Sequence, residues 1–267
     1  MSDRYAAMFD RLAQRGEGAL GAFVMLGDPD FETSPSILDA LIEGGADMIE
    51  VGIPFSDPIA DGPVIQGAAD RALAAGVTPR AALSLLEAFR ARHPTIPVGV
   101  LTYANLVLAR GRDEFYRKCA QAGVDSVLVA DVPAMEAEPF VRAASHHGIA
   151  PVLIAAANTP RRTLERIAAL GRAYTYCVTR AGVTGAGSGD VLRFDHRTMF
   201  DALAELGAPP PILGFGISTP GHVRAALASG ATGVISGSAI VAIVAENAPD
   251  RPERIRGFVA SLKAATI

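Results

Sequence analysis

Short apolar runs alternate with longer amphipathic segments along this chain. The runs have the length of buried strands, and the segments between them have the spacing of helices that bury one face. Repeats of this kind predict a parallel β-sheet covered by helices. The eight predicted strands are GAFVML (21–26), DMIEVGI (47–53), IPVGVLTY (96–103), VDSVLVAD (124–131), APVLIAA (150–156), AYTYCV (173–178), PPILGFG (210–216) and ATGVISG (231–237).

The segments between these runs carry helix signals. Several end on glycine, as helices commonly do, and many open on Ser, Thr or Pro. The charge-free stretch 225–245 has the length of a membrane span, but its Gly, Ser and Thr residues indicate a helix end, a strand and a helix start. Helices are predicted at SPSILDALIEGG (34–45), EFYRKCAQAG (114–123), AEPFVRAASHHG (137–148), TPRRTLERIAALG (159–171) and TPGHVRAALASG (219–230).

Eight strand and helix units in 267 residues match the usual size of a TIM (β/α)8 barrel. No linker rich in Pro, Gly and Ser divides the chain, so residues 1–267 are expected to form a single α/β domain. A doubly wound open sheet is the alternative, because periodicity alone does not close a barrel.

Composition and charge narrow the class of protein. Hydrophobic residues make up 50% of the chain and charged residues 19%, which is typical of a globular protein. The net charge is −4 with dispersed Lys and Arg, so neither a nucleic acid nor a membrane is an expected partner. With two cysteines, Cys119 and Cys177, and no visible secretory signal, the cytoplasm is the expected compartment.

Acidic residues stand at the end of the second predicted strand, in IEVGIPFSDPIADGP (49–63). By two-residue alternation Glu50 shares a strand face with Met48 and Gly52. A carboxylate in a barrel interior has a raised pKa and can exchange protons near neutrality, unless it is a structural ion-pair partner. Asp57 and Asp61 follow on the next loop, where each could instead cap a helix or form an Asx turn. Glu50 and one of these aspartates form a plausible acid and base pair.

Three glycine clusters stand at or after the ends of the last three predicted strands: GVTGAGSG (182–189), GFG (214–216) and GSAI (237–240). Glycine lets backbone N–H groups approach a phosphate, and a helix beginning after Gly237 and Ser238 would direct its positive end at the anion. A phosphate site after strands seven and eight is frequent in TIM barrels. Each cluster alone is better explained as a tight turn, but their order favours a phosphorylated substrate.

Other chemistries find little support. The only lysines, Lys118 and Lys263, lie in predicted helices rather than at strand ends, which disfavours a Schiff-base aldolase. The histidines are dispersed, and the one close pair, His146 and His147, has no further ligand at a suitable spacing, so no metal site is expected. No nucleophile-elbow motif is present. Proton transfer by carboxylates, without a cofactor, is therefore the expected chemistry.

The chain also resembles the α-subunit family of tryptophan synthase over nearly its whole length. The matching segments are FVMLGDP, IEVGIPFSDPIADGPVIQ, AAGVTP, HPTIPVGVLTYANLV, GVDSVLVADVP, YTYCVTRAGVTGA, GFGIST and GVISGSAIV. The resemblance implies a retro-aldol cleavage of indole-3-glycerol phosphate to indole and glyceraldehyde 3-phosphate in a TIM barrel.

The resemblance also implies roles for individual residues. Glu50 would be the acid and base, and Asp61 would stabilise the positively charged indole intermediate. Thr184 would meet Asp57 or Asp61 when the loops close. The phosphate would be bound by Gly185, Gly216, Gly237 and Ser238. The indole would lie among Phe23, Leu101, Leu128, Tyr176 and Phe215, which could equally be ordinary barrel core.

The family's partner is a β subunit that carries pyridoxal phosphate and receives indole, in an α2β2 assembly. The resemblance therefore implies no cofactor on this chain and a partner surface that includes the loop around Asp57 and Pro58. Ala181 and the GAGSGD segment depart from the family pattern, which affects the expected loop closure and communication with the partner. A free-standing lyase and a non-catalytic barrel that binds a phosphorylated ligand are the alternatives.

Overall fold

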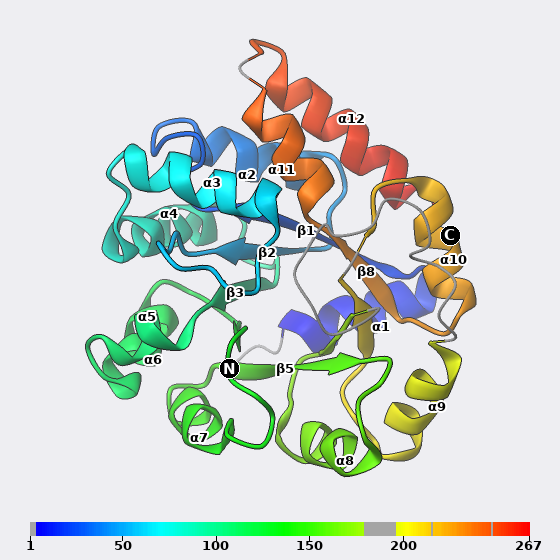
Figure 1. Ribbon diagram of the computed structural model, residues 1–267. Coiled ribbons are helices and arrows are strands. Elements are labelled where there is room, and N and C mark those ends of the chain that lie inside the picture. The colour runs from blue at the N-terminus through cyan, green and yellow to red at the C-terminus, as the bar shows by residue number, and fades with distance from the viewer. Residues whose placement is uncertain (1–3, 179–195, 215, 247) are drawn as a thin grey trace.

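Eight parallel strands close into a barrel in this computed structural model, which describes residues 4–178, 196–214, 216–246 and 248–267 (Figure 1). Each strand pairs with the next along the chain, and the first pairs with the last. The predicted TIM barrel is confirmed, and the open-sheet alternative is wrong. The strands are β1 (Ala19–Met25), β2 (Met48–Gly52), β3 (Val98–Thr102), β4 (Ser126–Val129), β5 (Ala150–Ala156), β6 (Thr175–Val178), β7 (Pro211–Leu213) and β8 (Gly233–Ser236).

The strands lie where the apolar runs predicted them, and most are shorter than the runs. β5 has the predicted bounds, whereas β7 has three residues where seven were predicted. Gly214, the residue after β7, leaves room for the ring of Tyr176, because a Cβ there would come within 2.1 Å of it. The Tyr176 hydroxyl donates to the Gly214 carbonyl at 2.9 Å, and the Gly214 N–H donates to the Cys177 carbonyl of β6 at 2.9 Å.

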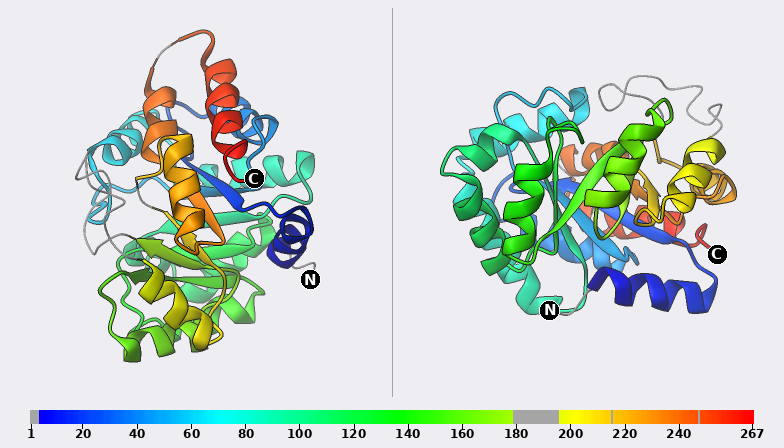
Figure 2. Two further views of the ribbon diagram at one scale, coloured as in Figure 1. Left: turned by 90° about the vertical axis from the view of Figure 1, so that its right-hand side faces the viewer. Right: turned by 90° about the horizontal axis from the view of Figure 1, so that it is seen from below.

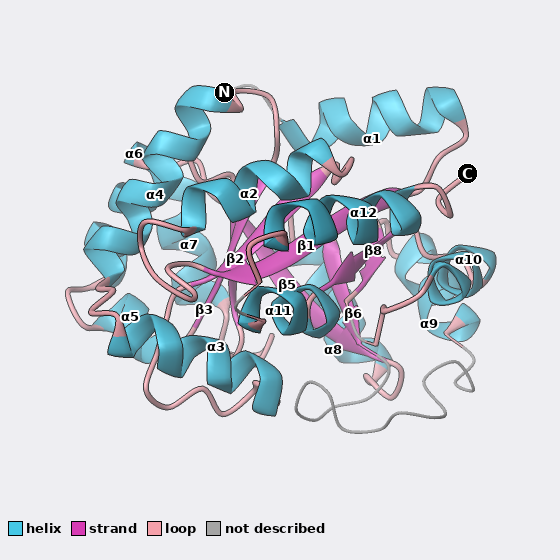
Figure 3. Cartoon of the chain, turned by 90° about the horizontal axis from the view of Figure 1, so that it is seen from above, coloured by secondary structure: helices cyan, strands magenta, loops and turns pink. Residues whose placement is uncertain are grey.

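Helices surround the barrel (Figure 3). The five predicted helices are confirmed as α2, α6, α7, α8 and α10, and the charge-free stretch 225–245 is a helix end, a strand and a helix start. The helices are α1 (Arg4–Arg15), α2 (Ser34–Glu43), α3 (Pro63–Ala74), α4 (Pro79–Arg92), α5 (Ala104–Leu108), α6 (Arg112–Gln121), α7 (Glu138–His146), α8 (Arg161–Leu170), α9 (Arg197–Glu205), α10 (Pro220–Ala228), α11 (Ser238–Ala245) and α12 (Arg251–Lys263).

Thr-Pro pairs begin two of these helices. The Thr78 side chain accepts a hydrogen bond from the N–H of Ala81 at the start of α4, and Thr219 accepts one from His222 at the start of α10. In both helices proline takes the first position, where no backbone N–H is needed. None of the helices that the structure describes is long and apolar enough to span a membrane.

Helix α1 lies across the end of the barrel at which the strands begin (Figure 2). Its Tyr5 is buried, and its hydroxyl shares a 2.8 Å hydrogen bond with the hydroxyl of Ser126, the first residue of β4. Gly99 of β3 leaves room for this contact, because a Cβ there would lie 3.1 Å from the Tyr5 hydroxyl oxygen. With this end closed, the opposite end is the one available to a substrate.

Candidate active site

Glu50 is the central charged residue of the barrel interior. Its side chain is 1% exposed, and the Tyr174 hydroxyl donates to its Oε1 at 2.8 Å. Tyr174 directly precedes β6, which is not a neighbour of β2, so this bond crosses the interior. The other oxygen, Oε2, is buried and accepts no hydrogen bond from any residue that the structure describes. It is therefore the oxygen available for proton exchange.

Burial sets the acidity of Glu50. Loss of hydration raises its pKa from 4.5 to about 7, which the Tyr174 hydrogen bond partly counteracts and the nearby charge of Asp61 increases. The Tyr174 pKa is itself raised well above its ordinary value by burial, so the phenol stays a donor. With a pKa near neutrality, Glu50 can both give and take a proton, as a general acid and base must.

Asp61 is the second buried carboxylate, on the loop between β2 and α3. It is 5% exposed, and burial raises its pKa to about 6, against a hydrogen bond from Tyr103 that lowers it. Tyr103 follows β3, accepts a 3.2 Å hydrogen bond from the N–H of Ala60, and stacks on Phe55 with ring centroids 5.4 Å apart. One aromatic residue thus holds both ends of the loop and its carboxylate.

The other aspartate of this loop lies outside the buried site. Asp57 is exposed and accepts a 2.5 Å hydrogen bond from the Ser56 hydroxyl. Its proposed gating partner, Thr184, lies outside the described residues, so that contact stays a prediction. Burial therefore selects Asp61 over Asp57 as the partner of Glu50.

Apolar side chains line the barrel next to Glu50. Phe23 is paired in register with Glu50, Leu128 is paired with Leu101, and Tyr176 stands two positions after Tyr174. Partners in a parallel ladder, and residues two apart, share a face, so these four predicted pocket residues face the interior. Phe215 lies outside the described residues.

Ile154 lines the same interior but was not predicted from the sequence. It is paired in register with Tyr176 and is 36% exposed, although it lies in the middle of β5. An exposed isoleucine on an inward face indicates a surface that an apolar ligand could cover. The signal in the sequence was the alternation within APVLIAA, which places Val152 and Ile154 on one face.

Two of the predicted phosphate-binding residues lie at the start of α11. Gly237 precedes this helix, Ser238 is its first residue, and no side chain caps it. The first N–H groups of a helix lack partners within it and favour an anion. Gly216, after β7, has φ +74° and is exposed. Gly185 lies outside the described residues.

Tyr174 and Tyr103, like Ile154, belong to the site but were not predicted from the sequence. Each contacts a carboxylate that is far away in the sequence, 124 positions in the case of Tyr174 and Glu50. The available signal was a tyrosine at the beginning or end of a buried strand, where its hydroxyl requires a partner.

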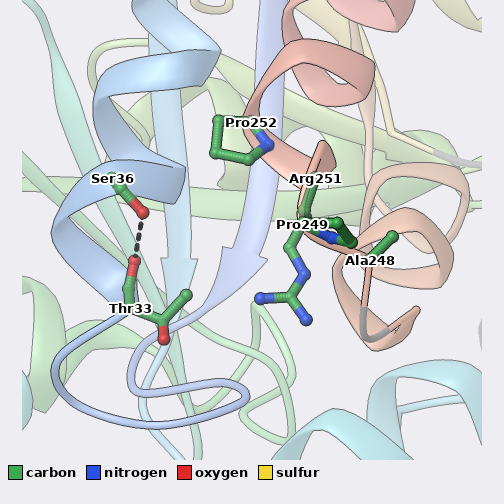
Figure 4. Close-up of a pocket in the computed structure, with 6 residues that line it drawn as sticks. All are labelled: Thr33, Ser36, Ala248, Pro249, Arg251 and Pro252. Atoms are coloured by element: carbon green, nitrogen blue, oxygen red, sulfur yellow. Dashed lines mark hydrogen bonds between the residues drawn. The ribbon is translucent and has the colours of Figure 1, made fainter.

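Two other features of the described residues lie on the outer ring, apart from this site: an open cavity, and a group of three side chains of types that can bind a metal. The cavity, of about 420 Å³, is lined by residues at the start of α2 and before and within α12 (Figure 4). Arg251 on its wall donates to the Glu246 carbonyl at 2.9 and 3.0 Å. The one group of three metal-binding side chains among the described residues, Asp113, His146 and His147, comes from α6 and α7.

Comparisons with known proteins show the family of the chain. A family model described as "Tryptophan synthase alpha chain" matches residues 9–265. The chain is 53% identical to the tryptophan synthase alpha chain of Cronobacter sakazakii over 268 residues, covering 99% of each. It is 55% identical to that of Klebsiella pneumoniae, covering 99% of this chain and 98% of the relative.

Solved structures give the same result. Tryptophan synthase subunit alpha from Legionella pneumophila superposes with a TM-score of 0.89 at 28% identity, covering 100% of this chain and 99% of that one. A chain from the tryptophan synthase a2b2 complex of Pyrococcus furiosus has a TM-score of 0.83 at 34% identity, covering 93% and 98%.

Proposed function

The chain belongs to the tryptophan synthase alpha chain family, and on this basis we propose that it cleaves indole-3-glycerol phosphate to indole and glyceraldehyde 3-phosphate. The observation that carries the proposal is the buried Glu50, whose pKa of about 7 suits both proton donation and proton acceptance. This makes the chain a carbon–carbon lyase subunit of tryptophan biosynthesis.

Two carboxylates are sufficient for the proton transfers. The protonated carboxyl of Glu50 gives its proton to C3 of the indole ring, which places positive charge on the ring nitrogen. The ionised Asp61 accepts a hydrogen bond from the indole N–H and stabilises that charge. Glu50, now ionised, takes the proton of the glycerol hydroxyl next to the ring as the carbon–carbon bond breaks. The electron pair of that bond returns to the ring, so indole and the aldehyde leave and Glu50 is again protonated.

The interior residues provide binding for both parts of this substrate. The indole ring would lie against Phe23, Leu101, Leu128, Tyr176 and Ile154, with Phe215 added as the resemblance implies. Tyr176 is buried, whereas its partner in register, Ile154, is 36% exposed. The phosphate would accept hydrogen bonds from the start of α11, at Gly237 and Ser238, and from Gly185 and Gly216. None of these steps requires a cofactor on this chain.

A β subunit is the proposed partner, in an α2β2 assembly with pyridoxal phosphate on the β subunit. Three exposed apolar residues support this: Ile59, Leu108 and Met135, which are 70%, 46% and 44% exposed. They follow β2, β3 and β4, which are neighbours in the barrel, so they stand on adjacent connections at its open end, with Leu108 at the end of α5. An exposed apolar surface at the mouth suits a partner that receives indole directly. The cytoplasm is the proposed compartment of this biosynthetic step.

The test replaces Glu50 with glutamine, which keeps the shape of the side chain and removes the proton exchange. We expect Glu50→Gln to lower the turnover of indole-3-glycerol phosphate by about 10²- to 10⁴-fold, with the fold kept in circular dichroism. Glu87→Gln, on the exposed face of α4, is the matched control and should retain wild-type turnover. A loss below tenfold in Glu50→Gln would contradict the assigned role.

A further inference from the structure

Two histidines and one aspartate from neighbouring helices meet on the outer ring. His146 is the last residue of α7 and His147 follows it, while Asp113 lies in the first turn of α6. In the sequence Asp113 is 34 positions from His147, so spacing could not reveal it as a ligand. In the structure, one carboxylate oxygen and one ring nitrogen from each histidine all lie within 4.8 Å of one another.

The three side chains differ in how exposed they are. His147 is 15% exposed, and its Nε2 lies 2.7 Å from Oδ1 of Asp113, which is 76% exposed. The His146 ring is edge-on to the His147 ring, with centroids 4.9 Å apart. Tetrahedral coordination with bonds of about 2.0 Å places ligand atoms about 3.3 Å apart. Small rotations of the two exposed side chains, His146 and Asp113, around a fixed His147 would reach that geometry.

The local charges leave room for a cation. Arg112 lies over the Phe140 ring, 5.5 Å from its centroid, and Arg117 forms an ion pair with Glu114 at 2.7 Å. Arg142, one turn before His146, has its guanidinium 3.7 Å from Glu138, toward the other end of α7. The carboxyl end of α7 also carries the negative end of the helix dipole, which favours positive charge there.

We propose that Asp113, His146 and His147 bind one divalent transition-metal ion, with Zn²⁺ as the best fit. Two imidazoles and a carboxylate suit Zn²⁺, Ni²⁺ or Cu²⁺ rather than Mg²⁺ or Ca²⁺, and water completes the coordination. The ion links the end of α7 to the start of α6, which pack against each other (Figure 1). Because only the folded chain presents all three ligands, binding stabilises the folded state. The site is on the outer ring, apart from Glu50 and Asp61.

The test is calorimetric titration of the metal-stripped full chain with Zn²⁺, together with thermal unfolding with and without the ion. We expect one ion per chain and a higher Tm with Zn²⁺. His146→Ala should weaken binding by at least about tenfold, a loss that even outer partners of a metal site produce, and should remove most of the Tm increase. His146 is chosen because the ion pair of His147 with Asp113 stays intact in that variant.

His93→Ala provides the matched control. His93 contacts Asp39 at 2.8 Å, as His147 contacts Asp113. The residue beside it is Arg92, which cannot serve as a metal ligand as His146 can. This control should bind Zn²⁺ like the wild type. An absence of binding by the wild type, equal binding by His146→Ala, or an equal loss in His93→Ala would each overturn the proposal. Zn²⁺ anomalous scattering between the three side chains in a crystal would support it.

Discussion

Glu50 is buried in the barrel interior, and the hydroxyl of Tyr174 holds one of its two carboxyl oxygens. Alternation along the strand put Glu50 on the face of Met48 and Gly52, and the structure places it in the barrel interior. Its hydrogen bond with Tyr174 was beyond reach, because that contact joins strands on opposite sides of the barrel. The choice between Asp57 and Asp61 likewise depended on burial, which the loop sequence alone does not determine.

Removing the hydroxyl of Tyr174 should change the pH profile of the reaction. This hydroxyl stabilises ionised Glu50 and so lowers its pKa. In Tyr174→Phe we expect the alkaline limb of kcat/KM, where Glu50 loses the proton that it gives to the ring, to move up by about one pH unit. Pre-steady-state or steady-state profiles from pH 5 to 9 measure this. Tyr116→Phe, a buried tyrosine of α6, is the control, and an unchanged alkaline limb in Tyr174→Phe would show that the bond does not tune Glu50.

At the scale of elements, the strand and helix pattern predicted every strand, and cap residues predicted several helix starts. α11 begins at Ser238, one residue before the start that the Gly237-Ser238 signal indicated. The ends of strands were less predictable, because they depend on contacts with distant residues. β7 ends at Leu213, three residues before the predicted end at 216. The gating contact between Asp57 and Thr184 stays a prediction.

The loop between β2 and α3 should depend on Tyr103. This residue holds Ala60 through its hydroxyl and Phe55 through its ring, and its hydrogen bond lowers the pKa of Asp61. In Tyr103→Phe, stacking remains while both hydrogen bonds are lost. We expect kcat to fall by about tenfold or more and the acidic limb of the pH profile to shift upward, because Asp61 must be ionised.

A control variant in the same loop separates the effect of the Tyr103 hydroxyl on Asp61 from the loss of any other hydrogen bond there. Ser56→Ala removes the hydrogen bond to exposed Asp57 in the same loop and should leave the acidic limb where it is in the wild type. If Tyr103→Phe and Ser56→Ala gave the same profile, the hydroxyl of Tyr103 would not be positioning Asp61.

At the scale of the whole molecule, eight units of the expected size favoured a barrel, and its closure is seen in the structure, where β1 pairs with β8. That residues 1–267 form one domain stays a prediction. Closure also has an energetic consequence, since it buries two carboxyls whose pKa values are raised, from 4.5 to about 7 for Glu50 and from 3.8 to about 6 for Asp61. The folded chain therefore binds more protons than the unfolded chain across this pH range.

Stability should accordingly fall as the pH rises. The contribution of Glu50 and Asp61 to the free energy of unfolding is complete below about pH 4, where both carboxyls are protonated in the folded and the unfolded chain. It is lost as the pH rises through about 7. Glu50→Gln removes the pH-dependent loss of stability that comes from Glu50. This loss corresponds to about 3 kcal/mol at 1.36 kcal/mol per pKa unit. Urea unfolding should therefore give equal stability for variant and wild type at pH 4 and a more stable variant at pH 8. A constant difference between the two at both pH values would contradict a raised pKa.

The most direct test of the central claim is indole release from indole-3-glycerol phosphate by the purified chain, measured alone and with a tryptophan synthase β subunit. We expect measurable release by the chain alone, stimulated by the partner, with equal amounts of indole and glyceraldehyde 3-phosphate formed. Fast release that the partner does not change would identify a free-standing lyase. Binding of the substrate without release under either condition would contradict the lyase assignment and leave a barrel that only binds a phosphorylated ligand.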